Sequence, residues 1–147
     1  MIRFREAAVD DLGAIAALLA DDGLGRGREA PGDPAYWAAF ARMSAQTGNI
    51  CLVAEEGGEI IACLQLTIIH GLSRRGMSRA QIEGVRVAAG RRGTGLGQAL
   101  MREAIARARE AGCGLVQLTT DLRRGDAHRF YEGLGFTGTH LGMKLEL

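Results

Sequence analysis

The sequence has few prolines and few cysteines, and each shortage excludes a class of protein. With two prolines among 147 residues, 47% hydrophobic residues and no repeating glycine triplet, the chain is neither collagen-like nor a disordered low-complexity tract. The three cysteines, Cys51, Cys63 and Cys113, stand apart at apolar positions and lack the Cys-x-x-Cys spacing of zinc and redox sites. We therefore expect reduced core cysteines and no metal site.

Net charge is low, and long hydrophobic runs are missing. Eighteen Lys and Arg against 17 Asp and Glu leave a charge of +1, so no overall field favours a nucleic acid or an anionic membrane as partner. There is no apolar run of about 18 residues, and the first residues, MIRFREAAVDD, lack the apolar segment of a signal peptide. We expect a cytoplasmic protein with no nucleic-acid or membrane partner.

Glycine, in contrast, is abundant: it supplies 22 of the 147 residues, where a typical protein has a share of about 7%. Because the chain has enough hydrophobic residues for a core, these glycines are expected at particular places within a folded domain. The length fits a single domain, so residues 1–147 are predicted to form one domain.

Apolar periodicity predicts a fold of mixed class, α/β or α+β, in which helices cover both faces of a sheet. The expected strands are 2–7, 49–55, 59–69, 80–87 and 115–120, with one or two more in 136–147. The expected helices are 12–20, 34–45, 95–111 and 126–134, the first capped by Asp10 and Asp11 and the third ended by Gly112. Gly57 and Gly58 predict a hairpin turn, 21–33 a mobile loop and 71–78 an exposed loop.

The strand expected at 80–87 changes phase. Its apolar residues are at even positions before Gly84 and at odd positions after it. Because a strand alternates with a period of two, the shift predicts one extra residue at Glu83-Gly84, which is a β-bulge. A loosely patterned strand buried on both faces is the alternative interpretation. A bulge would bend the strand away from its neighbour and leave backbone groups for an extended ligand.

A glycine-rich turn, 90–97, precedes the long helix and has the features of a pyrophosphate site. The helix start offers free N–H groups, and Gly93, Gly95 and Gly97 remove side chains that would keep a phosphate away. The turn lacks the Gly-Lys-Ser/Thr of a Walker A loop, and its spacing is not that of the dinucleotide fingerprint. Close helix packing is the alternative use of these glycines.

Two motifs together resemble the GNAT superfamily of acetyl-CoA-dependent N-acetyltransferases. The segment 92–97, Arg-Gly-Thr-Gly-Leu-Gly, matches the signature R/Q-x-x-G-x-G/A, and it follows Val85-Arg86-Val87. The segment 127–136, AHRFYEGLGF, resembles the second signature of the family near the C-terminus. The predicted order of elements is also that of the superfamily, whose sheet is mostly antiparallel with a bulged, splayed fourth strand.

The resemblance implies acetyl-CoA as cosubstrate and an amine as acceptor, and it assigns roles to individual residues. The turn would bind the CoA pyrophosphate, the strand before it would pair with the pantetheine arm, and Arg124 stands where many members have an asparagine that contacts the cofactor. The implied cofactor-binding residues are Val85, Arg86, Val87, Arg92, Gly93, Thr94, Gly95, Leu96, Gly97, Gln98 and Arg124.

Three residues are implied in catalysis. Glu83 resembles the general base, the backbone N–H of Val85 would polarise the thioester carbonyl, and Tyr131 matches the general acid. Glu83 could instead be a strand carboxylate paired with an arginine, and Tyr131 an aromatic that packs under the cofactor. His128, one turn from Tyr131, is expected at the surface, and His70 and His140 are isolated.

The acceptor is left open by the sequence, as a small-molecule or peptide amine. Loop carboxylates could attract a cationic amine, with Tyr36 and Trp37 as a wall, or they could belong to a solvated polar loop; these carboxylates are Asp21, Asp22, Glu29 and Asp33. A non-catalytic module that binds acyl-CoA is the second hypothesis, and a nucleotide-phosphate enzyme of another fold is the third. A homodimer is consistent with the family.

Overall fold

The structure, a computed structural model, describes residues 1–147. Contacts within the chain divide it into two units, Met1–Gln117 and Leu118–Leu147, which are described in turn.

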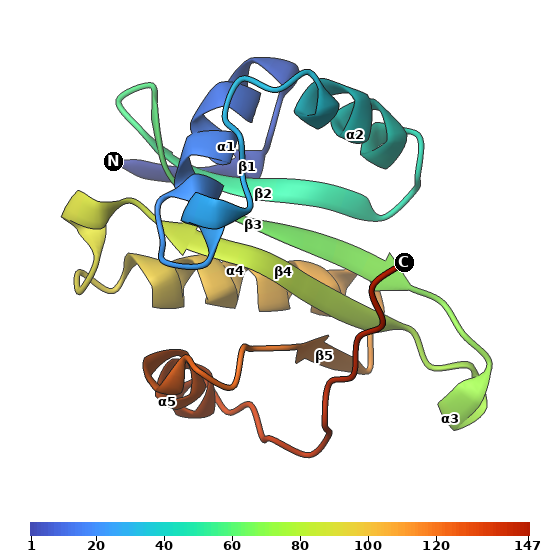
Figure 1. Ribbon diagram of the computed structural model, residues 1–147. Helices are drawn as coiled ribbons and strands as arrows, with labels where there is room; N and C mark the ends of the chain where they lie inside the picture. Colours follow the sequence, from blue (N-terminus) through green and yellow to red (C-terminus); the bar gives the residue numbers. More distant parts are fainter. The chain divides into compact units, whose positions relative to one another are not determined.

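One sheet of five strands, in the order β1-β2-β3-β4-β5, organises the fold (Figure 1). Strands β1 to β4 pair antiparallel in chain order, which confirms the mostly antiparallel sheet that the resemblance implies. The hairpin of β2 and β3 turns at Gly57 and Gly58, both of which have the positive φ that the turn requires. The strands are β1 (Ile2–Glu6), β2 (Asn49–Glu56), β3 (Glu59–Ile69), β4 (Arg79–Val87) and β5 (Leu115–Leu118).

Helices cover both faces of this sheet, which confirms the predicted mixed class. Figure 1 shows α1 (Leu12–Ala20) and α2 (Ala35–Ser44) on one face and α4 (Leu96–Glu110) on the other. The short α3 (Ser73–Gly76) lies in the connection between β3 and β4, where an exposed loop was predicted. No helix is long and apolar enough to cross a membrane.

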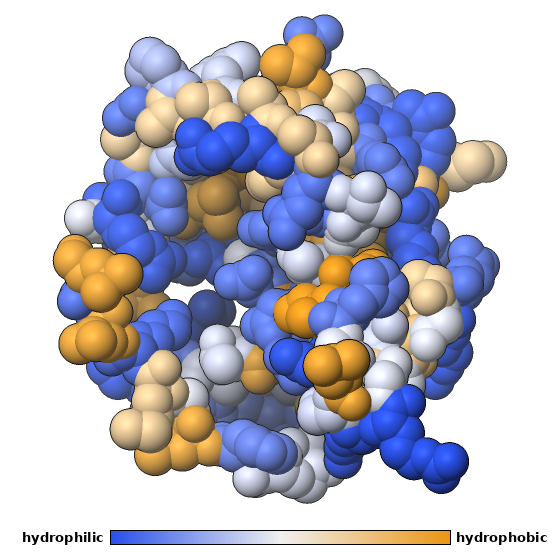
Figure 2. Space-filling model, turned by 90° about the vertical axis from the view of Figure 1, so that its right-hand side faces the viewer, coloured by the Kyte–Doolittle hydropathy of each residue, from blue (hydrophilic) through white to orange (hydrophobic).

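The two faces have different cores. On the α4 side, Leu64 and Ile82 of the sheet are buried, as are Leu100 and Met101 of the helix. On the α1 side, Leu12, Ile15 and Leu18 form a buried cluster with Val53 of β2 and Cys63 of β3. These apolar positions recur at helical spacing in α1 and α4 and at alternate residues in the strands. Figure 2 shows a mostly hydrophilic face of the molecule, with hydrophobic residues in small separate groups.

The cap of α1 lies where it was predicted, at Asp11, but its side chain bonds elsewhere. Asp11 occupies the N-cap position, but its carboxylate accepts no hydrogen bond from the helix. Asp11 Oδ2 accepts hydrogen bonds from the Ala8 backbone N–H (2.7 Å) and from Arg5 Nη1 (2.7 Å). The carboxylate therefore fastens the start of the helix to β1, and the Arg5 guanidinium holds the pKa of Asp11 below its usual value.

The second unit contains α5 (Gly125–Gly133), whose bounds agree with those of the predicted helix, 126–134, to within one residue. Gly135 has φ +97° and ends this helix, with the Phe136 backbone N–H donating to the Tyr131 carbonyl. The predicted strands in 136–147 are wrong, because no strand forms there. Leu141, Met143 and Leu145 alternate as in a strand, but their side chains remain exposed, since the segment pairs with no neighbouring strand.

Candidate acetyl-transfer site

The predicted β-bulge is present in β4. Its pairing with β3 joins Cys63 to Arg86 and Gln65 to Glu83, so Leu64 is the single residue on β3 opposite Gly84 and Val85. Gly84 has φ +61°, a backbone conformation that favours glycine. Because of the extra residue, Glu83 and Arg86 both lie on the sheet face that carries α1, although they are three residues apart.

Glu83 is exposed on that face and forms no ion pair. Ten ion pairs occur in the structure, and none includes Glu83. The alternative interpretation of this residue, a strand carboxylate neutralised by an arginine, is therefore excluded. Its carboxylate is available to a ligand beside the bulge.

The glycine-rich turn opens α4 as predicted. Gly93 and Gly95 have φ +77° and +86°, and Gly95 is the N-cap residue of the helix. A Cβ at either glycine would have no atom within 4 Å, so the turn presents open backbone. Thr94 Oγ1 donates to the Arg91 carbonyl and closes the turn. Free N–H groups and the positive end of a 15-residue helix suit a phosphate group here.

The arginines of this region are held by carboxylates of the same unit. Arg86 Nε lies 2.9 Å from Asp22 Oδ2, and these side chains are only 10% and 19% exposed. Arg92 Nη2 donates to the Asp21 carbonyl (3.0 Å), and Arg92 Nε donates to the Val87 carbonyl (3.2 Å). Both contacts tie the end of α1 to β4 and the glycine turn. Arg91 pairs with Glu56 on β2 in the same way.

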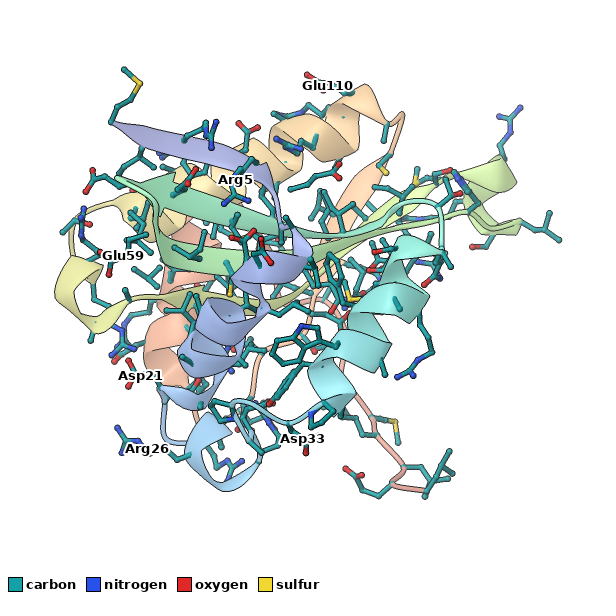
Figure 3. The ribbon with its side chains drawn as sticks, turned by 90° about the horizontal axis from the view of Figure 1, so that it is seen from above. Arg5, Asp21, Arg26, Asp33, Glu59 and Glu110 are labelled. Carbon is teal, nitrogen blue, oxygen red and sulfur yellow. The ribbon has the colours of Figure 1, made fainter.

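The remaining carboxylates of the 21–33 loop are also engaged. Tyr36 Oη donates to Glu29 Oε1 (2.8 Å) and accepts from the Ala30 backbone N–H (3.0 Å), and Asp33 Oδ1 accepts from the Ala35 N–H (2.9 Å) at the start of α2. Viewed from the side of α1 and α2, Asp21, Arg26 and Asp33 are spread along this loop (Figure 3). Glu29 and Asp33 thus hold the loop and the start of α2. Because Asp21 and Asp22 pair with Arg92 and Arg86, each of the four loop carboxylates has a partner within the protein.

A row of polar side chains crosses β2 to β5 on the face of Glu83, and sequence reasoning missed it. Gln65 Nε2 donates to Asn49 Oδ1 (2.9 Å), and Thr67 Oγ1 donates to the same oxygen (3.3 Å). Gln117 Nε2 donates to Gln81 Oε1 (2.7 Å). All five residues are half-buried. The matching parity of Gln65 and Thr67 with Gln81 and Glu83 was the signal available in the sequence.

The second unit carries the other predicted residues. Tyr131 is half-buried, with its ring edge-on to Phe130 at a centroid distance of 5.1 Å and to Phe136 at 5.9 Å. Arg124 is exposed at the N-cap position of α5. His128 is half-buried rather than on the surface, because its Nε2 hydrogen-bonds with the Asp121 carbonyl (3.0 Å).

A model of the acetyltransferase (GNAT) family matches residues 14–136. The chain belongs to the GNAT acetyltransferase family. The match spans both motifs, the bulged strand and the helix that follows the glycine turn.

Solved structures of this fold cover the entire chain. A transcriptional regulator from Bacillus halodurans is 45% identical, with a TM-score of 0.96 and full coverage of both chains. An acetyltransferase from Trypanosoma brucei is 28% identical, with a TM-score of 0.83 and full coverage of both chains. A curated relative, the aminoalkylphosphonate N-acetyltransferase of Salmonella typhimurium, is 32% identical over 60% of this chain and 56% of its own length. The chain thus spans just over half the length of that relative.

The thiols of this family member are poor nucleophiles. Cys51 and Cys63 lie on the α1 side of the sheet, and burial raises the pKa of each to about 12. Both thiols are therefore protonated near neutral pH, which disfavours an acetyl-cysteine intermediate. All three cysteines are free, and no group of three or more His, Cys, Asp or Glu is gathered as in a metal site.

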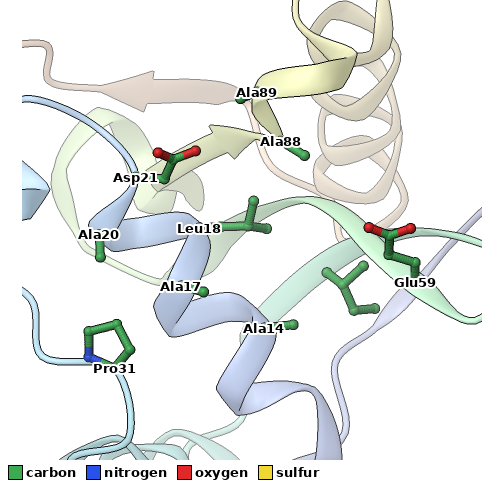
Figure 4. A pocket seen from close by; sticks show the side chains of 10 residues that line it. Ala14, Ala17, Leu18, Ala20, Asp21, Pro31, Glu59, Ala88 and Ala89 are labelled. Atoms are coloured by element: carbon green, nitrogen blue, oxygen red, sulfur yellow. The ribbon is translucent and has the colours of Figure 1, made fainter.

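An open hollow of about 690 Å³ lies beside the glycine turn (Figure 4). Its wall consists of small residues of α1, the start of β3 and the residues that follow β4, among them Ala14, Ala17, Glu59, Ala88 and Ala89. None of the predicted catalytic or cofactor-binding residues lines it, so the hollow does not locate the site.

Proposed function

We propose that this acetyltransferase transfers the acetyl group of acetyl-CoA directly to a primary amine of a small molecule or peptide. The bulge at Gly84, with an unpaired Glu83 beside it, is the observation that carries the proposal. The curated relative is named for acetylating an amine, which supports an amine as acceptor. We retain the proposal that residues 1–147 act as a single N-acetyltransferase domain.

Acetyl-CoA would be held by β4 and the glycine turn. The open backbone at Gly93 and Gly95 fits the pyrophosphate, and the strand after the bulge would pair with the pantetheine arm. Arg86 and Arg92 would contribute backbone groups, since their side chains are occupied by Asp22 and Asp21. The binding residues proposed are Val85, Arg86, Val87, Arg92, Gly93, Thr94, Gly95, Leu96, Gly97, Gln98 and Arg124.

The proposed transfer is direct and needs no covalent intermediate on the enzyme. Glu83 accepts a proton from the acceptor ammonium, directly or through water, and the freed nitrogen lone pair attacks the thioester carbon. The Val85 backbone N–H stabilises the oxyanion, a contribution typically worth about 2.7–4 kcal/mol. The C–S bond breaks as the carbonyl re-forms, and the thiolate takes a proton from Tyr131. The amide nitrogen gives one of its two protons to the Tyr131 phenolate, directly or through water, and keeps the other, while Glu83 releases its proton to solvent.

The proposal is tested by measuring thiol release from acetyl-CoA with a panel of primary amines, together with calorimetry of CoA binding. Glu83→Gln is expected to lower kcat/KM at least a hundredfold with CoA binding intact, because general-base catalysis contributes about 10²–10⁴-fold. Glu59→Gln, at the exposed start of β3, is the matched control. A protein that binds no CoA at micromolar concentration contradicts the proposal.

Tyr131 is tested separately. Tyr131→Phe removes the hydroxyl and keeps the ring that packs on Phe130 and Phe136, so it should lower turnover at least tenfold without weakening CoA binding. An unchanged rate would assign Tyr131 to packing alone.

A second candidate function is a regulatory module that binds acyl-CoA without turnover. The relative that is 45% identical over the full chain is named a transcriptional regulator, and this observation favours the candidate. The free carboxylate of Glu83 favours the enzyme, because a module without turnover needs no base. If the protein binds CoA but no amine leads to thiol release, the regulatory module is the correct function.

A further inference from the structure

We infer, on the basis of the proposed function, that the acceptor is a monoamine whose remaining part is neutral and hydrogen-bonding, and that Gln65 and Gln81 bind that part beside Glu83. Gln65 is the direct cross-strand partner of Glu83, and Gln81 is two residues away on the same strand and face. Neighbouring Cβ atoms of such positions are about 5–7 Å apart, so a small amine at Glu83 must lie against both carboxamides.

The distribution of negative charge favours a single ammonium group. Among the carboxylates on this face of β2 to β4, Glu55 is paired with Arg3 and Arg5, which leaves Glu83 alone. The carboxylates of the adjoining loop are held by Arg86, Arg92, Tyr36 and the start of α2. A second ammonium on the acceptor would lose water without gaining a carboxylate, which is unfavourable.

The distribution of positive charge disfavours an anionic acceptor of small size. Arg86 and Arg92 are already neutralised by Asp22 and Asp21. Arg79 has no ion pair, but it is four residues before Glu83, roughly 13 Å along the strand. Its Nη1 lies 3.7 Å from the position that a Cβ of Gly71 would occupy, near the β3–β4 connection. A phosphonate a few carbons from the amine would not reach it.

The carboxamides themselves are prepared for a neutral polar group. Asn49 holds one N–H of Gln65 and leaves Gln65 Oε1 as an acceptor, whereas Gln117 occupies Gln81 Oε1 and leaves the Gln81 N–H groups as donors. A hydroxyl or an amide both donates and accepts, so it can satisfy the two side chains together. An apolar group would leave these half-buried groups without a partner, which costs affinity.

Four acceptors of matched length test this in the wild-type protein: propanolamine, butylamine, diaminopropane and aminopropylphosphonate. With acetyl-CoA as donor, kcat/KM is expected to be highest for propanolamine, by about tenfold over butylamine, which lacks one hydrogen-bonding group. The two charged acceptors should be poorer still. A higher value for the diamine or the phosphonate overturns the inference and leaves the proposed function standing. No transfer to any amine overturns both.

A gain of function tests the residue assignment. Gln65→Glu places a second carboxylate opposite Glu83, so kcat/KM for diaminopropane relative to propanolamine should rise about tenfold, with an unchanged KM for acetyl-CoA. Gln46→Glu is the matched control, because it adds the same charge at the outer end of the row, where Gln46 Oε1 accepts from Asn49 Nδ2. If Gln65→Glu shifts the ratio no more than Gln46→Glu does, Gln65 does not contact the acceptor.

Discussion

The sheet face that carries α1 has an apolar half and a polar half, and the same strands contribute to both. Around Val53 and Cys63, the face is apolar and sealed by Leu12, Ile15 and Leu18 of α1. From Gln65 towards the β3–β4 connection, the same face carries polar side chains, of which Gln65, Thr67 and Gln81 are half-buried. Neighbouring segments of one strand can thus serve different purposes: the apolar segment stabilises the fold, and the polar segment is free to bind a ligand.

The largest effect is expected at the boundary, where Arg86 pairs with Asp22. Asp22→Ala should lower the free energy of unfolding by about 3–5 kcal/mol, because it leaves a nearly buried guanidinium without its carboxylate. Urea denaturation measures the change. Asp21→Ala is the matched control, since its pair with Arg92 is about half exposed and is worth about 0–1 kcal/mol. Equal losses for the two variants would show that Arg86 does not depend on Asp22.

The second prediction compares the halves directly. Ile15→Ala removes buried atoms from the α1 cluster and should cost about 2–5 kcal/mol. Gln65→Ala removes a half-buried amide with one hydrogen bond and should cost about 1 kcal/mol. Thermal and urea unfolding of both variants measure the two losses in unfolding free energy. A larger loss at Gln65 would mean that the polar half also holds the fold together.

The third prediction concerns Gly84, which separates the halves on β4. Gly84→Ala should destabilise by about 1–2 kcal/mol, because φ +61° is unfavourable for a residue with a Cβ. Gly13→Ala is a control of opposite sign: Gly13 lies in α1, a Cβ there meets no atom within 4 Å, and alanine in a helix is favoured by about 0.5–1 kcal/mol. A neutral Gly84→Ala would argue against the bulge.

The smallest effect is a pH dependence at the edge of the apolar half, where Arg5 pairs with Asp11. Arg5 lowers the pKa of Asp11 in the folded protein, so the pair stabilises the fold above the unfolded pKa of about 3.9, and this stability is lost as pH falls. Arg5→Met should therefore have a lower free energy of unfolding than the wild type at pH 6, and this difference should be smaller near pH 3. Urea midpoints across this range measure it; a constant difference would contradict the pairing.

The sequence predicted the features that depend on local pattern. The phase change at Gly84, the helix at α1 and the glycine turn follow from periodicity and from glycine chemistry. The strands expected in 136–147 failed, because alternation shows that a segment can form a strand but not that a neighbouring strand is present to pair with it.

Long-range pairing was equally beyond the sequence. Asp22 and Arg86 are far apart in the chain, so the loop carboxylates looked available to a cationic ligand until the structure joined them to arginines. The polar row on β2 to β5 was missed for the same reason, since its four strands align only through their register. The position of Glu83 beside a bulge was predictable because the phase change is local, whereas its role as the base comes from the family resemblance and is a proposal.

The extra residue in β4 also predicts what a shorter strand would keep and what it would lose. Without Gly84, Leu64 would face Val85 alone, and strict alternation would still place Glu83 and Arg86 on the α1 side of the sheet. The proposed base and the ion pair with Asp22 would therefore stay on one face, whereas the bulge and the bend that it gives the strand would be lost. A single-residue gap at this position in a relative would thus indicate a regular strand without the bulge, and not a rearrangement of these two side chains.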